Sequence, residues 1–535
     1  MSAPAAPPPP HPPLPGLQAV AYMLAATVIG LSQGLQQGFV STSLPQLAGD
    51  LGITTTSAAW LLAVYMIPRA ALPVLLIKIR TQYGLRRFAE LGIILYALVA
   101  LASLWAVDFR SALVLQFLAG AAAAPLSTLA FLYMLEPLSP QAKMTLGLPL
   151  AMTVLMTGPT LARVVGPYLI GDGGMTAVHV TGLGMALVSL MLVFCLPLRP
   201  IPRQKVIEPL DFASFVLIGA GFGGLIVAFV MGPIYNWTDV AWIGWLLAGA
   251  ALSLTLAVVV ELNRTAPLLD IRWLASPAIL HLTGTLFLFR LILSEQSAGA
   301  PRMFQVLGVA PQQMTVLFAV IALASLMGAL ACIAWMRPTR VPQFHLAALL
   351  LIAAGAWLDS GAGVLTRPAQ MVVSQALIGF AAMLFMPPAM MAGLLSALAK
   401  GPQYILSFVI VFISTQSLGG VLGSGLFNTF TTRREALHLQ DLSVQLTATD
   451  PATVATLAGR AGMLAAQIPD AAARRAQAAT DLGQQVAAQA WVSAYADAYA
   501  LTALAALLAA AVLLLHLLRD VMARRAAVQN TGTTP

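Results

Sequence analysis

Long apolar runs alternate with short polar segments along the whole chain. Each run holds 20 to 26 residues, which is enough for a helix to cross the roughly 30 Å hydrocarbon layer of a membrane. Backbone groups in lipid must pair within their own segment, and the runs lack the two-residue alternation of barrel strands. We therefore predict fourteen membrane-spanning helices, at 18–41, 58–79, 88–107, 111–135, 145–170, 177–198, 212–232, 241–260, 278–298, 314–336, 344–363, 369–393, 403–428 and 497–518.

The composition also indicates a protein of the lipid bilayer. Of the 535 residues, 59% are apolar and 9% are charged, whereas ordinary soluble domains carry roughly 25% charged residues. These proportions exclude a water-soluble globule. The net charge of +8 does not indicate nucleic-acid binding, because the 27 Lys and Arg residues are scattered between the apolar runs rather than gathered on one face.

The chain shows no pattern that is typical of an enzyme. Its six histidines are isolated from one another, and its two cysteines, Cys195 and Cys332, lie inside apolar runs. No pair has the spacing of metal ligands, and no serine or cysteine has a recognisable catalytic partner. We therefore expect neither a reaction centre nor a bound cofactor.

The distribution of Lys and Arg predicts the orientation of the chain. With a cytoplasmic N-terminus, the inner loops and tails carry sixteen basic residues and the short outer loops carry three, Arg110, Arg302 and Arg367. Inner loops of membrane proteins are enriched in Lys and Arg, whereas long outer loops cross regardless of their charge. We therefore expect both termini in the cytoplasm.

Short motifs between the runs resemble those of one transporter family. The matching motifs are Leu44-Pro45, Gly49-Asp50-Leu51-Gly52, Gly84-Leu85-Arg86-Arg87, Glu208-Pro209-Leu210-Asp211-Phe212, Ala266-Pro267-Leu268-Leu269-Asp270-Ile271-Arg272, Phe304-Gln305-Val306-Leu307-Gly308 and Ser417-Leu418-Gly419-Gly420. They resemble the fourteen-span drug:proton antiporters of the major facilitator superfamily, the EmrB/QacA type. This resemblance implies an all-helical major facilitator fold of 6 + 2 + 6 spans, and a secondary transporter of the bacterial inner membrane that is driven by the proton gradient.

The resemblance also implies a domain organisation. We expect, in chain order, a disordered Pro-rich cytoplasmic tail at 1–16, a six-helix bundle at 17–198, two extra central helices with their loops at 199–277, a second six-helix bundle at 278–518 that includes a long periplasmic loop at 430–495, and a cytoplasmic tail at 519–535.

The chain departs from the family at positions tied to coupling and to the binding of cationic drugs. Gln36 stands where span 1 usually has an aspartate, and Gln116 stands where span 4 usually has an arginine. In the loop after span 2, Ile77, Thr81 and Gln82 replace the usual glycine, aspartate and arginine. The candidate site must therefore be argued from the residues that this chain does have.

Three arginines lie inside predicted spans. Arg69 lies near the middle of span 2, Arg163 in the outer half of span 5, and Arg290 near the middle of span 9. Each costs roughly 2.5–3.5 kcal/mol on insertion scales, so such residues face a protein interior or a watery cavity. We assign the three to substrate binding; the alternative is a structural role in which each pairs with backbone carbonyls.

Span 1 adds a polar face. Gln33, Gln36 and Gln37 stand at i, i+3 and i+4, so they project from one side of the helix. We assign them to substrate binding, with interhelical hydrogen bonding as the alternative. Gln375 and Gln416, in spans 12 and 13, are candidate partners for them from the opposite half.

Glu295 is the acidic residue that we place well inside a span, in the outer half of span 9. It follows Arg290 by five residues, about 140° around the helix, which makes the two poor partners for each other. We expect Glu295 either to exchange a proton and couple transport to the pH gradient, or to form a static ion pair with an arginine of another helix. Three cations and one such acid predict anionic or weakly acidic substrates.

The long outer segment carries a further pattern. Val454, Leu457, Ala461, Leu464 and Ile468 recur at three- and four-residue steps and form one apolar stripe on a helix. Residues 470–495, which precede span 14, are rich in Ala and Gln and contain no proline, so span 14 is expected to begin outside the membrane as a longer helix. The stripe either belongs to a solvated cap or docks a periplasmic adaptor (membrane fusion) protein, as the resemblance to EmrB-like pumps implies.

These observations together predict a secondary active transporter. We expect proton-coupled efflux of small amphiphilic compounds, anionic or weakly acidic in character. The alternatives are a proton-coupled importer and a non-transporting receptor or scaffold on the same fold.

Overall fold

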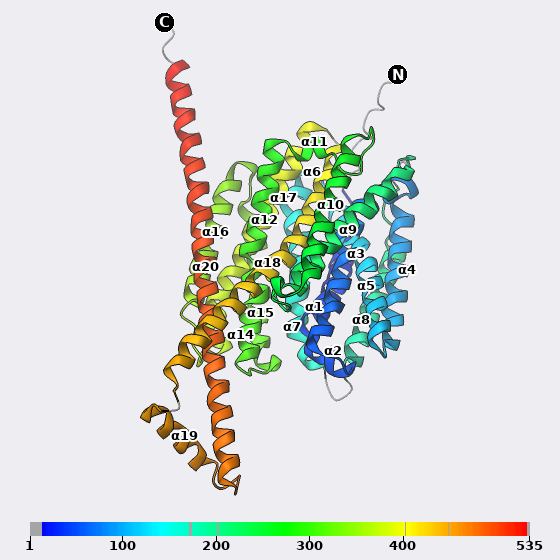
Figure 1. Ribbon diagram of the computed structural model, residues 1–535. Helices are drawn as coiled ribbons and strands as arrows, with labels where there is room; N and C mark the ends of the chain where they lie inside the picture. The colour runs from blue at the N-terminus through cyan, green and yellow to red at the C-terminus, as the bar shows by residue number, and fades with distance from the viewer. Residues whose placement is uncertain (1–12, 171–173, 201–202, 402, 448, 532–535) are drawn as a thin grey trace, which may run out of the picture.

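The computed structural model describes residues 13–170, 174–200, 203–401, 403–447 and 449–531. The tail expected at 1–16 therefore falls mostly outside the described residues. Within the described part, fourteen helices are long and apolar enough to cross a membrane, which confirms the predicted number of spans. Both ends of the described chain lie at the same end of the molecule (Figure 1), which we name the inner end after the predicted orientation; the opposite end is named the outer end.

The first six spans form what we call the N-terminal bundle. Two short helices, α2 (Leu44–Asp50) and α6 (Pro140–Ala142), lie in its connections. The six spanning helices are α1 (Gly16–Thr42), α3 (Thr55–Tyr83), α4 (Leu85–Ala102), α5 (Phe109–Leu135), α7 (Leu148–Leu169) and α8 (Thr176–Cys195).

Two further spans and a short helix follow, α9 (Pro209–Met231), α10 (Ala241–Leu262) and α11 (Ile271–Leu274). The last six spans form the C-terminal bundle. Its helices are α12 (Pro277–Ile292), α13 (Ser294–Ala298), α14 (Ala300–Val306), α15 (Thr315–Trp335), α16 (Val341–Asp359), α17 (Val372–Lys400), α18 (Gln403–Gln445) and α20 (Ala471–Thr531), with α19 (Pro451–Met463) between the last two spans. Because α20 continues to Thr531, most of the tail predicted at 519–535 is helical.

Local sequence signals set the starts of several spans. The carboxylate of Asp108 accepts hydrogen bonds from the backbone amides of Arg110 and Ser111 at the start of α5, and the hydroxyl of Thr54 accepts one from the amide of Ser57 at the start of α3. Both satisfy amides that have no partner within the helix. Pro209 begins α9 and Pro277 begins α12, at the one helical position where a missing amide hydrogen costs nothing.

Glycine lets α1 and α7 approach each other closely. A Cβ atom on Gly34 would lie 2.9 Å from the Cα atom of Gly158, and one on Gly38 would lie 2.8 Å from the Cα atom of Pro159. Small residues at a helix crossing allow two backbones to pack in a membrane. The backbones of α1 and α7 therefore pack in direct contact within the N-terminal bundle.

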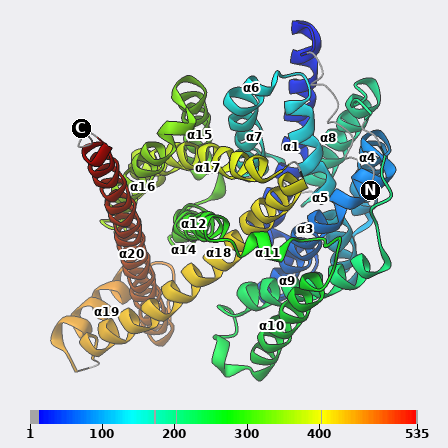
Figure 2. The same cartoon turned by 90° about the horizontal axis from the view of Figure 1, so that it is seen from above.

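The two bundles meet along two seams, seen from above in Figure 2. On one side α7 packs against α15, and on the other α3 packs against α18. Helix α9 packs against both α3 and α18, and α10 lies outside it against α9 (Figure 2). The indole of Trp237, just after α9, donates to the hydroxyl of Thr429 on α18 at 2.8 Å. The extra helix pair thus covers the α3/α18 seam.

The ninth span is not one straight helix. The sequence predicts a single run at 278–298, whereas the structure divides the span into α12, α13 and α14, with breaks at Leu293 and Gly299. Pro301 stands at the start of α14 and has no amide hydrogen to continue the ladder. A Cβ atom on Gly299 would lie 2.7 Å from the ring of Tyr499 on α20, so glycine also makes room for that helix.

The outer part of the C-terminal bundle projects away from the other helices (Figure 1). Span 14 is part of a longer helix, as predicted, since α20 starts at Ala471. The predicted striped helix is present only in part, as α19, which packs against α20. Because α19 ends at Met463, Leu464 caps it and Ile468 lies beyond it. In its stripe Leu457 and Ala461 are half-buried, whereas 50% of Val454 is exposed.

Candidate functional site

The three predicted arginines are half-buried and lie on different helices. Arg69, on α3, donates through Nη1 to the hydroxyl of Tyr65 at 3.0 Å. Arg290, on α12, donates through Nε to the carbonyl of Gln416 on α18 at 3.3 Å. Within the part of the chain that the structure describes, neither guanidinium lies within 4.0 Å of a carboxylate.

Arg163 joins the two bundles. It lies on α7, and its Nη2 donates to the carbonyl of Ser297 on α13 at 3.1 Å. Its guanidinium also stands 5.0 Å from the ring centre of Phe318 on α15, within the range of a cation–π contact. No carboxylate of the described residues pairs with Arg163 either. We call the Arg163–Ser297 hydrogen bond the outer contact.

Glycines of α18 make room for Arg290. A Cβ atom on Gly419 would lie 3.0 Å from Cγ of Arg290, and one on Gly420 would lie 3.1 Å from its Nη2. The guanidinium therefore lies against a glycine-lined stretch of α18, where it donates to the carbonyl of Gln416. This stretch belongs to one of the motifs that carried the family resemblance.

The glutamines of span 1 do not act as one group. Gln33 is fully buried and turns toward α5, where its Oε1 accepts from the hydroxyl of Ser127 at 3.3 Å. Gln36 lines a small cavity of about 40 Å³ together with Gln116, and the Oε1 atoms of both are buried without a hydrogen-bond partner. Gln37 is half-buried. Gln36 and Gln116 stand where the resembled family has an aspartate and an arginine, and both side chains line this cavity.

Glu295 lies in a fully buried cluster that contains a second acid. Its Oε1 accepts from Nε2 of Gln375 on α17 at 2.8 Å, and the same Nε2 donates to Oδ2 of Asp359 on α16 at 2.7 Å. The other oxygen of Asp359 accepts from the hydroxyl of Ser374. Exposed fractions are 0% for Glu295 and Gln375 and 3% for Asp359 and Ser374. We call these four residues the carboxyl cluster.

The carboxyl cluster bears on one of the two sequence-based alternatives for Glu295. The static ion pair between Glu295 and an arginine is wrong, because no such pair exists among the described residues. Arg290 and Glu295 have different partners, as their spacing predicted. Gln375, a candidate partner of the span 1 glutamines, instead bridges the two acids.

Asp359 and Ser374 were not among the predicted site residues. Asp359 lies within the predicted span at 344–363, near its outer end. Its position inside an apolar run was the available signal, since an acid in a membrane span is costly and usually functional.

A second group of charges lies near the inner end of the N-terminal bundle. Asp211, at the start of α9, accepts from Nζ of Lys78 at 2.7 Å and from Nη2 of Arg264 at 2.6 Å. Arg264 also pairs with Glu208 and Glu261, each at 3.0 Å. Burial alone would lower the pKa of Arg264, but its hydrogen bonds to the three carboxylates outweigh that effect and raise the pKa above its usual value. We call these five residues the inner charge cluster.

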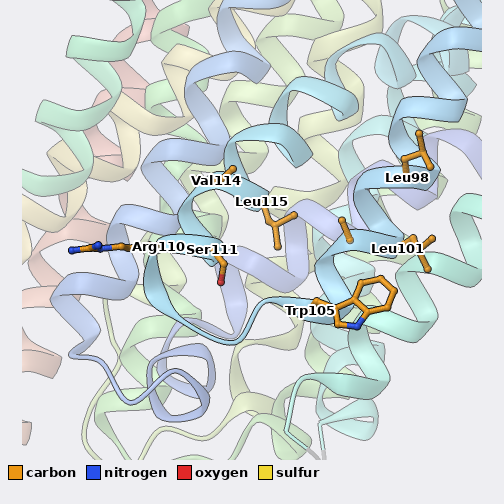
Figure 3. A pocket seen from close by; sticks show the side chains of 8 residues that line it. Leu98, Leu101, Trp105, Arg110, Ser111, Val114 and Leu115 are labelled. Atoms are coloured by element: carbon orange, nitrogen blue, oxygen red, sulfur yellow. The ribbon is translucent and has the colours of Figure 1, made fainter.

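A larger hollow of about 580 Å³ opens on the surface between α4 and α5. Figure 3 shows its apolar lining, which includes Leu98, Leu101 and Trp105, and shows Arg110 pointing away from these side chains. None of the predicted site residues lines it, so this hollow is not the candidate site.

Comparisons with known proteins agree with this architecture. No family model matches the chain. The multidrug resistance protein Stp of Mycobacterium tuberculosis is 26% identical over 254 residues, 46% of this chain and 46% of Stp. The multidrug export protein EmrB of Escherichia coli K12 is 23% identical over 267 residues, 48% of this chain and 50% of EmrB. The matches thus span about half the length of these curated relatives.

Solved structures share the fold over nearly the whole chain. The human organic anion transporter MFSD10 (TETRAN) superposes with a TM-score of 0.55 at 13% identity, covering 91% of this chain and 98% of that one. The POT family transporter PepTSo gives a TM-score of 0.55 at 13% identity, covering 94% and 99%. The chain therefore has the fold of the major facilitator superfamily, and its sequence matches to Stp and EmrB support assignment to the drug-efflux proteins of that superfamily.

Proposed function

We propose that the protein is a secondary active transporter of the bacterial inner membrane that exports small amphiphilic, anionic or weakly acidic compounds in exchange for protons. The observation that carries this proposal is the presence of three half-buried arginines, Arg69, Arg163 and Arg290, without a carboxylate partner in the described residues. Export, rather than import, is supported by the similarity to EmrB, which is named a multidrug export protein.

The physical argument concerns charge balance. A buried cation that is satisfied only by hydroxyl and carbonyl groups is poorly compensated. An organic carboxylate or sulfonate supplies the missing charge and forms charge-assisted hydrogen bonds with guanidinium groups. A lipophilic cation meets repulsion from the same three residues. The site therefore selects for anions.

Transport in proteoliposomes tests the substrate class. With an imposed pH gradient, the wild-type protein should move a radiolabelled aromatic acid such as benzoate in preference to tetraphenylphosphonium, a lipophilic cation. Arg69→Ala and Arg290→Ala should each weaken apparent binding of the acid by about tenfold to a hundredfold, since a hydrogen bond to a charged group contributes roughly 1.5–3 kcal/mol. Arg110→Ala, on the surface, serves as the control and should leave binding unchanged. Robust transport of the cation, unaffected by the two substitutions, would refute the proposed substrate class.

We assign proton coupling to Glu295. Glu295→Gln keeps the size of the side chain and its bond with Gln375 but cannot exchange a proton. The variant should still bind the acid, while accumulation should no longer respond to the pH gradient. Gradient-driven accumulation at the wild-type level would exclude Glu295 as the coupling residue.

We also propose that both termini are cytoplasmic and that α19 docks a periplasmic adaptor protein. Protease should remove terminal tags only from the cytoplasmic side. Deletion of 450–480 should abolish efflux from cells while purified protein still folds and binds the acid, because the deletion removes the surface and not the spans. Efflux unchanged by the deletion would refute docking at α19.

A further inference from the structure

The carboxyl cluster places two acids on one amide group. Nε2 of Gln375 donates to Glu295 at 2.8 Å and to Asp359 at 2.7 Å. We propose that Glu295 and Asp359 carry a single proton between them, with the amide of Gln375 holding the two carboxyl groups together, and that this proton keeps the outer contact between the two bundles closed. The proposal rests on the proposed function and adds to it a second coupling residue, Asp359, and a link from proton to conformation.

A count of donors supports a single proton. The two carboxyl groups present four oxygens, and the side chains of Gln375 and Ser374 satisfy three of them. The fourth, Oε2 of Glu295, is buried without a hydrogen-bond partner among the described residues. A proton on this oxygen would turn the group into a donor, and the neighbouring Oε1 atom of Gln375 is a buried acceptor that also has no partner.

Among the described residues, no Lys, Arg or His lies within 4.0 Å of either acid. Arg163 of α7 bonds to the backbone of Ser297 on α13 rather than to an acid, and the hydroxyl of Tyr499 on α20 points to Sδ of Met303 at 3.8 Å. The nearest arginines along the chain have other neighbours: Arg290 of α12 bonds to α18, and Arg302 of α14 is exposed. Two like charges in a dry site repel each other and lose their hydration, so one of the acids must be neutral for the cluster to stay buried.

The same short helix carries the outer contact. Glu295 and Ser297 both belong to the five-residue α13. The carbonyl of Ser297 accepts from Arg163 of the N-terminal bundle at 3.1 Å, and the hydroxyl of Ser297 stands 3.3 Å from that of Ser424 on α18. Breaks at Leu293 and Gly299 separate α13 from its neighbours, so α13 can shift without moving the rest of the span.

Loss of the proton should therefore open the outer side. With both acids charged, moving the cluster toward water lowers the free energy of the protein, and α13 moves with the cluster. That shift breaks the Arg163–Ser297 bond. Opening then requires α7 to leave α15 as well, which breaks the contact between the hydroxyls of Tyr168 and Thr315 at 3.3 Å and the hydrogen bond from Gln312 to the carbonyl of Pro167 at 3.2 Å. Rebinding of one proton restores the buried cluster and the outer contact. Proton uptake from the outside thus accompanies closure of the outer side.

Distance measurements on substrate-free protein test the proposal. Spin labels are attached to cysteines introduced at Thr176 and Ala310, which are exposed at the outer ends of the two bundles, with Cys195→Ser removing the exposed native thiol. Electron–electron resonance then gives the distance between the labels from pH 5 to pH 9 in lipid nanodiscs. The wild-type background should show a short distance at low pH and a long one at high pH.

Three substitutions give distinct expected results. Glu295→Gln imitates the protonated acid and should keep the distance short at every pH. Asp359→Asn removes the neighbouring charge that favours proton binding, so the transition should move to lower pH by about one unit or more. Gln375→Leu removes the donor that stabilises both charged carboxylates, so the transition should move to higher pH. Glu90→Gln, a partly exposed acid at the inner end of α4, is the control and should leave the transition in place.

The outcomes separate this inference from the proposed function. A distance that does not depend on pH, or that still follows pH in Glu295→Gln, overturns the inference even if the protein transports acids. Shifts of the same sign in Asp359→Asn and Gln375→Leu also overturn it, and these two variants suffice if Glu295→Gln fails to fold. A normal set of transitions in a protein that moves neither benzoate nor tetraphenylphosphonium refutes the proposed function alone.

Discussion

Replacement of Asp211 by asparagine should destabilise the protein through the inner charge cluster. The carboxylate of Asp211 is fully buried and accepts from Lys78 at 2.7 Å, from Arg264 at 2.6 Å and, through its other oxygen, from the backbone amide of Glu208 at 2.8 Å. Through these bonds it ties α3 to the start of α9 and to the segment after α10. Asparagine keeps the shape of the side chain but removes its charge and one acceptor.

The structure sets the size of the effect. Removing one partner of a buried ion pair costs about 3–5 kcal/mol, because the other charge stays buried. Arg264 would keep its ion pairs with Glu208 and Glu261, each with a nitrogen–oxygen distance of 3.0 Å. Lys78 would keep only the carbonyl of Ala266 at 3.0 Å. Since one of the two cations remains paired, we expect the free energy of unfolding to fall by an amount near the lower limit, about 3 kcal/mol.

Thermal unfolding in detergent, followed by intrinsic fluorescence, measures the loss. Asp211→Asn should lower the unfolding midpoint by several degrees, and the double variant Lys78→Met/Asp211→Leu should recover most of it, because an apolar pair removes both buried charges. Glu90→Gln is the matched control, since its pair with Arg86 is exposed and should contribute less than about 1 kcal/mol. An unfolding midpoint for Asp211→Asn equal to that of the wild type would refute this account of the cluster.

Two further predictions concern α1 and α19. Gly34→Ala should destabilise the protein by about 1–3 kcal/mol in the same unfolding assay, because the added Cβ atom stands 2.9 Å from Gly158 and forces α1 and α7 apart; Gly184→Ala on α8, where a Cβ atom meets nothing within 4 Å, should be neutral. Hydrogen bonds from the amide and hydroxyl of Thr453 lower the pKa of Asp450, so its cap on α19 is complete above about pH 4 and is lost as the pH falls through the lowered value. Amide exchange in α19, corrected for intrinsic rates, should therefore accelerate below that pH in the wild type, and exchange equally fast at pH 7 would contradict the cap.

The sequence predicted the spans because their signal is local. Each run of apolar residues is long enough to cross the bilayer by itself, so no knowledge of neighbouring helices is needed. The break in the ninth span was also readable, since Gly299 and Pro301 stand where α13 ends and α14 begins. It was missed because apolar content alone does not distinguish a straight helix from a broken one.

The partners of the site residues were beyond the sequence. Glu295 was predicted as a buried acid, but its neighbours Asp359 and Gln375 come from two other helices, and only the packing of α13, α16 and α17 brings them together. Arg163 was predicted from its cost in lipid, yet its contact with Ser297 depends on how the two bundles meet. Periodicity along one helix carries no information about such pairings.

The cover formed by α9 makes the protein asymmetric toward molecules that dissolve in the bilayer. At the α3/α18 seam an amphiphile diffusing within a leaflet meets α9 and α10 before it reaches either bundle. At the α7/α15 seam no such shield stands in the described part of the chain, and Val165, Tyr168 and Val316 expose 39%, 70% and 67% of their surface there. The two seams are therefore covered unequally: α9 and α10 shield one, whereas at the other the hydroxyls of Tyr168 on α7 and Thr315 on α15 lie 3.3 Å apart with no further helix over them in the described residues.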